Sequence, residues 1–120
     1  MTRLLLVDDE DDIRLLARII LEGAGYDIVD APSGERALEI LDAMTVDLVL
    51  LDIRMAGMDG WEVMAAIAQR PDDGRPRVLA CSAHVAPKVL DRALELGCVE
   101  VLVKPFTPDE CLAAVRRALA

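Results

Sequence analysis

The chain has 120 residues, of which 54% are hydrophobic and 29% are charged, and its formal net charge is −9. This length and composition predict one compact domain spanning residues 1–120 rather than a disordered chain. The acidic balance argues against direct binding to nucleic acid or to an anionic membrane, because both attract basic surfaces, and it favours cations or a basic partner.

Three cysteines, Cys81, Cys98 and Cys111, lack the number and spacing of a disulfide framework or a zinc site. We interpret them as buried thiols of a reducing compartment. The N-terminal apolar run is too short for a signal peptide, and no apolar stretch approaches the length of a membrane span. The expected location is therefore cytoplasmic.

Five short apolar runs alternate with stretches in which apolar residues recur at helical spacing. Strands separated by helices run parallel, and right-handed crossovers place helices on both faces of the sheet. The pattern therefore predicts an α/β fold with a doubly wound five-stranded parallel sheet, without giving the strand order. The predicted strands contain Leu4–Val7, Ile28–Val29, Leu48–Leu51, Val78–Cys81 and Val101–Val103.

Each predicted helix has an apolar face for the core. Gly97 marks the end of the fourth helix, and Thr107 is the expected N-cap of the fifth. Trp61, in the third helix, is expected to be a partly exposed anchor. The predicted faces are Ile13, Leu16, Ala17 and Ile20; Ala37, Leu38 and Leu41; Val63, Met64 and Ile67; Leu90, Ala93 and Leu94; and Leu112, Val115 and Leu119.

Carboxylates follow two of the predicted strands. Asp8 and Asp9 come directly after the first strand, and Asp52 ends the third. In open parallel sheets ligands bind outside the carboxyl ends of the strands. If these two strands are neighbours, their carboxylates raise one another's pKa unless a cation intervenes, and Mg²⁺ suits such an oxygen site. Asp11 and Asp12 are interpreted as acids that favour a helix N-terminus.

Two more polar side chains occupy strand ends. Ser82 ends the fourth strand, and Lys104 directly follows the fifth. A lysine beside a buried strand requires a carboxylate or phosphate partner. A nucleophilic carboxylate, a metal site, a hydroxyl donor and a cation together are suited to phosphoryl transfer onto an aspartate.

Four motifs resemble those of response regulator receiver domains of two-component signalling. Their order and spacing agree with that family over the whole chain. The resemblance implies a flavodoxin-like fold with five βα units and strand order 2-1-3-4-5. The motifs are LLLVDDE at Leu4–Glu10, LVLLDIRMAGMDG at Leu48–Gly60, VLACSAH at Val78–His84 and VLVKPF at Val101–Phe106.

The resemblance also implies a role for each strand-end residue. Asp52 is the expected phosphoacceptor. Ser82 and Lys104 are expected to hold the phosphoryl oxygens, while Arg54 and His84 are candidates for tuning the phosphate lifetime. The expected ligands of Mg²⁺, or of Mn²⁺, are Asp8, Asp9, Asp52 and the backbone carbonyl of Arg54.

A receiver domain takes its phosphoryl group from a histidine kinase or a phosphotransfer protein. Its only catalysis is its own phosphorylation and dephosphorylation, so it is not expected to be an enzyme in the ordinary sense. The added charge of about −1.5 to −2 is expected to move the ends of the fourth and fifth strands. Output then passes through the face made by the fourth helix, fifth strand and fifth helix.

The sequence departs from the family at several positions, two of which bear on the loop after Asp52 and on the switch. Val101 stands where receiver domains usually carry Tyr or Phe, whose rotamer changes on activation, so we expect a reduced or rerouted switch there. Ala56 replaces the usual proline in the loop after Asp52 and is expected only to loosen that loop slightly.

Three alternatives compete with a phosphorylated receiver domain. A haloacid-dehalogenase-like phosphohydrolase needs a second acid where this chain has Arg54. A flavodoxin-like cofactor binder needs a phosphate-binding first loop, but this loop is acidic from Asp8 to Asp12. A receiver-like module that binds partners without phosphorylation remains open.

Overall fold

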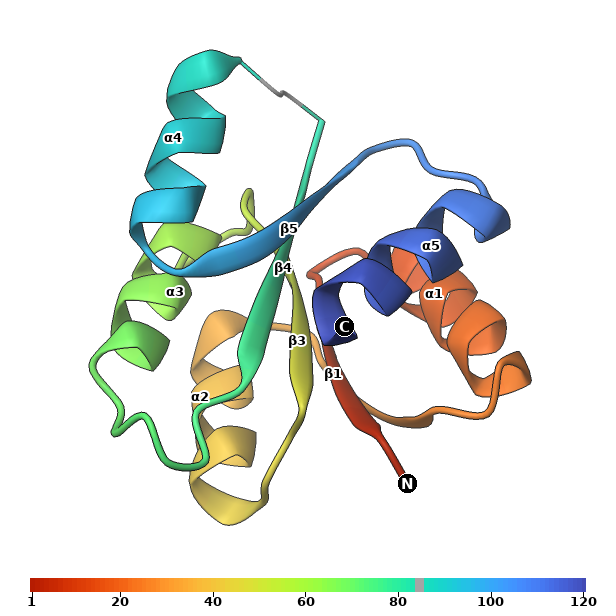
Figure 1. Cartoon of the computed structure of the whole chain (residues 1–120), viewed down its shortest axis with the longest axis horizontal. Coiled ribbons are helices and arrows are strands. Elements are labelled where there is room, and N and C mark those ends of the chain that lie inside the picture. Colours follow the sequence, from red (N-terminus) through yellow and green to blue (C-terminus); the bar gives the residue numbers. More distant parts are fainter. Residues whose placement is uncertain (84–85) are drawn as a thin grey trace.

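In the computed structural model, residues 1–83 and 86–120 are described, and within them five strands alternate with five helices (Figure 1). The alternation follows the predicted order. The elements are β1 (Arg3–Val7), α1 (Asp11–Gly23), β2 (Asp27–Ala31), α2 (Gly34–Ala43), β3 (Leu48–Asp52), α3 (Gly60–Ala68), β4 (Arg77–Ser82), α4 (Pro87–Glu95), β5 (Cys98–Val103) and α5 (Pro108–Leu119).

The strands form one parallel sheet in the order β2-β1-β3-β4-β5. This confirms the doubly wound, flavodoxin-like sheet and the strand order that the resemblance implied. The order of connection reverses between β1 and β3, where Val7 lies opposite Leu51. Ligand sites of open α/β sheets lie at this kind of reversal, so the residues after β1 and at the end of β3 meet where a site is expected.

Helices cover both faces of the sheet (Figure 1): α1 and α5 lie on one side, and α2, α3 and α4 on the other. The central strand β3 is buried along its whole length. Leu50 packs in the core with α1 and α5, whereas Leu51 packs in the core with α2, α3 and α4. Burial on both faces explains why the strand is an unbroken apolar run in the sequence.

The predicted helix ends at Gly97 and Thr107 are confirmed. Gly97 follows α4 with φ +93°, a left-handed conformation that favours glycine. Thr107 accepts a hydrogen bond from the Glu110 amide at 3.1 Å, and the Glu110 carboxylate accepts one from the Thr107 amide at 2.9 Å. These reciprocal bonds form the capping box that begins α5.

Two predicted core residues were wrong, because both Leu16 on α1 and Leu94 on α4 are exposed, with 46% and 55% of their surface accessible. On α1, Ala17 is buried as predicted, and Leu21 is buried as well. Apolar residues surround more of α1 than the sheet can cover, so the periodicity alone could not select the buried face. The exposed residues Leu15, Leu16 and Ile19 are called the α1 apolar surface below.

Among residues 1–83 and 86–120, none of the helices has the length and apolar character needed to cross a membrane. Trp61 on α3 is partly buried, as predicted, and the Arg92 guanidinium of α4 lies 4.3 Å from the centroid of its ring. This cation–π contact joins two neighbouring helices on the same face of the sheet.

Candidate functional site

Three carboxylates converge at the ends of β1 and β3. Asp8 and Asp9 follow β1, and Asp52 is the last residue of β3. One oxygen from each carboxylate lies within 4.8 Å of the other two. Asp8 and Asp52 are buried, with 6% and 5% of their surface exposed, whereas Asp9 is exposed. The convergence predicted from the strand ends is therefore present, because β1 and β3 are neighbours.

Lys104 lies between the two buried carboxylates. Its Nζ is 2.8 Å from Asp8 Oδ2 and 3.4 Å from Asp52 Oδ2. Burial by itself lowers the pKa of Lys104, but the hydrogen bond to Asp8 and the charge of Asp52 raise the pKa above its ordinary value. The lysine therefore remains positively charged beside the carboxylates.

The environment of Asp52 opposes its ionisation. Burial is the largest cause that raises the pKa of Asp52, and the charge of Asp8 acts in the same direction. Lys104 and the Arg54 amide, which donates to Asp52 Oδ1 at 3.3 Å, lower the pKa but do not offset the burial. A further cation beside these carboxylates would favour the ionised form.

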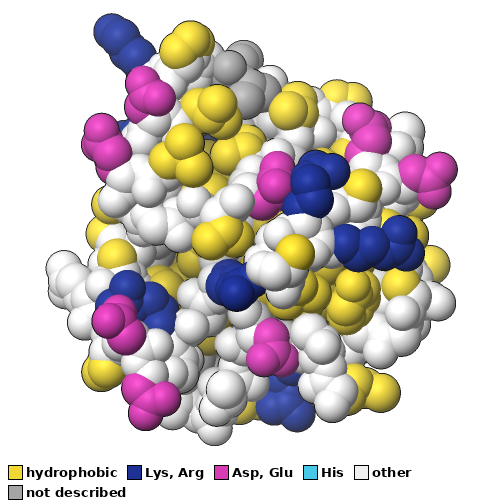
Figure 2. All heavy atoms as spheres, viewed as in Figure 1, with side chains coloured by type: hydrophobic (Ala, Val, Ile, Leu, Met, Phe, Trp, Pro, Cys, Tyr) yellow, Lys and Arg dark blue, Asp and Glu magenta, His cyan; other side chains and the backbone are white. Residues whose placement is uncertain are grey.

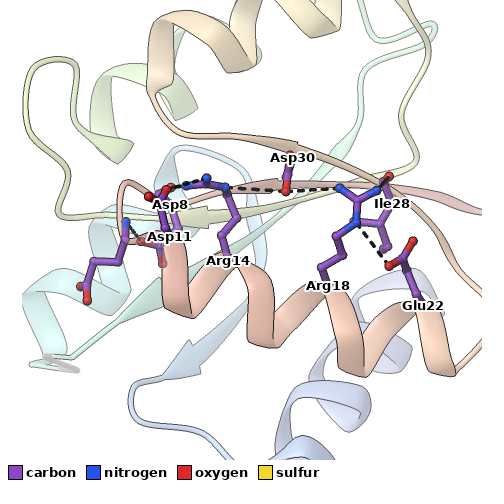
Figure 3. Close-up of polar contacts among 8 residues, drawn as sticks. Asp8, Asp11, Arg14, Arg18, Glu22, Ile28 and Asp30 are labelled. Atoms are coloured by element: carbon purple, nitrogen blue, oxygen red, sulfur yellow. Dashed lines mark hydrogen bonds and ion pairs between the residues drawn. The ribbon is translucent and has the colours of Figure 1, made fainter.

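Asp8 is held through both its backbone and its side chain (Figure 3). The Glu10 amide donates to Asp8 Oδ1 at 2.9 Å, and Arg14 Nη1 donates to the Asp8 carbonyl at 2.8 Å. Arg14 also pairs with Asp11 at 2.7 Å and lies 3.7 Å from Asp30 of β2. The guanidinium therefore ties the end of β1 to α1 and β2.

The sequence reasoning did not find Arg14. Its spacing of three residues from Asp11 was the available signal, since this spacing allows an ion pair on a helix surface. That spacing could not show that the same guanidinium reaches back to the Asp8 carbonyl. Asp11 and Asp12 lie in the first turn of α1, as predicted for acids at a helix N-terminus.

Ser82 and Arg54 lie along a cleft that begins at this edge of the sheet. Both line it together with Trp61 of α3 and Val89 of α4. Ser82 is the last residue of β4 and is buried, and its carbonyl accepts a hydrogen bond from the Lys104 amide at 2.9 Å. His84 lies outside the described residues, so its predicted role stays a prediction.

The donor set fits a hard divalent cation. Three carboxylates and one lysine leave an excess of negative charge at the strand ends. Oxygen ligands of this kind suit Mg²⁺, which usually binds through a few carboxylates and keeps several waters. The acidic cluster is typical of the metal site in the family that the motifs resemble.

Comparison with known proteins decides the family, because the sequence matches the response regulator receiver domain over residues 4–116. The chain is a response regulator receiver domain. This receiver domain is 34% identical over 117 residues to sporulation initiation phosphotransferase F of Bacillus subtilis, covering 98% of the chain and 93% of the relative. The structure of the chemotaxis protein CheY4 of Vibrio cholerae matches it with a TM-score of 0.94, at 28% identity and 99% coverage of both chains.

The receiver domain also resembles part of longer proteins. It is 38% identical over 117 residues to the positive alginate biosynthesis regulatory protein of Pseudomonas aeruginosa, covering 95% of the chain but 46% of the relative. It therefore spans about half the length of some curated relatives and nearly all of others. Membership of this family contradicts the phosphohydrolase and cofactor-binder alternatives.

Proposed function

We propose that this receiver domain accepts a phosphoryl group on Asp52. Receiver domains are phosphoacceptors of two-component systems, and their only catalysis is their own phosphorylation and dephosphorylation. The observation that supports Asp52 is its place within 4.8 Å of two other carboxylates, with the Lys104 ammonium 3.4 Å away. Asp8 shares these neighbours, but it follows β1 and is the closer partner of Lys104 at 2.8 Å, whereas Asp52 is itself the last residue of β3 and lies farther from the ammonium.

The transfer can be written with the residues at hand. An Asp52 carboxylate oxygen forms a bond to phosphorus while the bond from phosphorus to the donor's histidine nitrogen breaks, and the electron pair returns to the imidazole. Lys104 compensates the charge on the phosphoryl oxygens, and the Ser82 hydroxyl donates a hydrogen bond to one of them. Positioning and charge compensation are the main requirements of this reaction.

The metal would be held by the three carboxylates and the backbone carbonyl of Arg54. Asp9 and Asp52 would bind it directly, and Asp8 directly or through water. When bound, Mg²⁺ would neutralise charge that develops on the phosphoryl oxygens. Mn²⁺ would suit the same oxygen ligands.

Two surfaces support roles for protein partners. The α1 apolar surface begins one turn after Asp11, so a histidine kinase or phosphotransfer protein that reaches Asp52 would cover it. The second surface lies on α4 and β5, where the exposed hydrophobic residues are Leu94, Val99 and Val103. Figure 2 shows hydrophobic side chains near α4 and β5, with acidic and basic groups interspersed around them, which suits an output partner.

The three cysteines support a reducing, cytoplasmic location. All are free and buried. Burial raises the pKa of Cys111 to about 11 and also raises the pKa of Cys81 and Cys98, so these thiols stay protonated at neutral pH. They behave as apolar core residues.

Phosphorylation of Asp52 is tested with acetyl phosphate and MgCl₂, followed by intact-mass measurement. Wild-type protein is expected to gain one phosphoryl group, and Asp52→Ala is expected to gain none. Asp12→Ala is a matched control, because Asp12 is an exposed acid in the first turn of α1. Equal labelling of Asp52→Ala would place the phosphoryl group elsewhere, and an unlabelled wild type would favour the phosphorylation-independent module.

A further inference from the structure

The loop that joins β3 to α3 is held by two carboxylates from other parts of the chain. The Ala56 amide donates to Asp9 Oδ2 at 3.0 Å, and the Met58 amide donates to Glu35 Oε1 at 3.1 Å. Between them Gly57 has φ +73°, a left-handed conformation that favours glycine. The two hydrogen bonds therefore fix the loop on both sides of its most permissive residue.

The two carboxylates that hold the loop differ, because Asp9 belongs to the acidic cluster and Glu35 does not. Asp9 is also the exposed member of that cluster, whereas Asp8 and Asp52 are buried. An exposed aspartate is free to change rotamer unless something holds it. The Ala56 amide supplies that restraint.

The hydrogen bond and the converging carboxylates are present together. While Asp9 Oδ2 accepts from Ala56, an Asp9 oxygen still lies within 4.8 Å of ligand atoms on Asp8 and Asp52. A carboxylate has two oxygens and about four acceptor sites, so it can bond to an amide and to a cation at once. The amide therefore orients the carboxylate rather than competing for it.

We infer that Ala56 is a positioning residue whose backbone N–H holds Asp9 ready for the metal. The same bond holds the loop that carries Arg54, two residues earlier in the chain, against the site. This inference rests on the proposed function, since the metal site belongs to it. Groups that orient metal ligands commonly change metal affinity about 10- to 100-fold when they are removed.

The test removes the N–H of residue 56 without removing the side chain. Replacing Ala56 by lactic acid turns this amide into an ester and keeps the methyl side chain. Ala56→Pro also removes the donor, but it changes the side chain to the ring that receiver domains usually carry here. Calorimetric titration with MgCl₂ is expected to show about tenfold weaker binding for both variants than for wild type. Far-UV circular dichroism establishes that each variant is folded.

Glu35→Ala is the matched control, because it removes the neighbouring amide–carboxylate bond of the same loop without touching the acidic cluster. Its Mg²⁺ affinity is expected to stay within about twofold of wild type. Unchanged or tighter binding by the ester variant overturns the inference. Equal weakening by Glu35→Ala also overturns it, since general loosening of the loop would then explain both results.

The inference and the proposed function fail in different experiments. Phosphoryl labelling of wild type at saturating MgCl₂, with unchanged Mg²⁺ affinity in the ester variant, rejects only the role of Ala56. Unlabelled wild type, with weakened Mg²⁺ binding in the ester variant, rejects only phosphorylation of Asp52.

Discussion

Phosphoryl transfer needs an ionised carboxylate at Asp52, but the buried position of this side chain makes the ionised form unfavourable. The side chain is buried beside two other carboxylates, and burial is the main cause of its raised pKa. Lys104 compensates part of this charge but is shared with Asp8, to which it lies closer. A charge kept in such a place lowers stability, as is common at functional sites.

The variant Asp52→Asn should therefore be more stable than wild type at neutral pH. Because the pKa of Asp52 is higher in the folded chain than in the unfolded chain, the ionised group penalises folding above the folded-state pKa. Removing it should raise the free energy of unfolding by roughly 0.5–2 kcal/mol in urea titrations at pH 7. The difference should shrink as pH falls through the folded-state pKa, where wild-type Asp52 binds a proton.

Asp12→Asn is the control for this comparison, because Asp12 is exposed in the first turn of α1. It should give no gain, since a negative charge at a helix N-terminus is favourable. A lower stability of Asp52→Asn at pH 7 would show that pairing with Lys104 outweighs the cost of burial.

Strand-end residues could be predicted because parallel strands present their carboxyl ends at one edge. That rule, with the strand order taken from the family, was enough to bring Asp8, Asp9, Asp52 and Lys104 together. The amide of Ala56 could not be found in this way. The sequence does show that residue 56 has an N–H, because alanine stands where the family usually has proline. That this N–H reaches Asp9 depends on where the loop lies in space, which the side-chain pattern does not show.

At the scale of elements, β5 is the strand through which a change at the site would reach the surface. Val101 lies opposite Ala80 of β4 and packs, partly buried, against the core formed with α2, α3 and α4. Val103 lies opposite Ser82 at the end of the same strand pair. Valine has a single, stiff side-chain torsion, so Val101 cannot move between two distant positions as an aromatic ring can.

We therefore predict a small response of β5 to phosphorylation. Amide NMR spectra with and without beryllium fluoride, a phosphoryl mimic, should change around Asp52 and Ser82 but little around Val101. The variant Val101→Tyr should enlarge the changes on β5 and α4, because it supplies a side chain with two alternative rotamers. A large shift centred on Val101 in the wild type would contradict this prediction.

Element boundaries followed from the sequence more closely than buried faces did. Strands were found because burial on both sides requires apolar runs, and helix ends because Gly97 and Thr107 have specific backbone roles. The faces of α1 and α4 were partly wrong, as Leu16 and Leu94 show. Periodicity reports where apolar residues lie on a helix, but the neighbouring elements determine which of them are covered.

At the scale of the whole molecule, the sheet joins two hydrophobic cores. The Cα radius of gyration is 12.8 Å, close to the roughly 14 Å expected for a compact domain of this length. Successive residues of β3 belong to opposite cores, with Leu50 on one side and Leu51 on the other. Neither core can be lost while the other keeps an intact sheet.

This arrangement predicts that residues 1–120 unfold as one domain. Trp61 is the single tryptophan and reports on the side of α3, whereas Leu21 is fully buried on the side of α1. Leu21→Ala should lower the free energy of unfolding by about 2–5 kcal/mol. Because both cores should unfold in one transition, the urea midpoint should fall equally for Trp61 fluorescence and for far-UV circular dichroism.

Ile67→Val changes the core on the opposite side of the sheet. It should lower the free energy of unfolding by about 0.5–1.5 kcal/mol and shift both signals together. If Leu21→Ala displaced the circular dichroism transition while leaving the Trp61 transition in place, the two cores would be separate folding units.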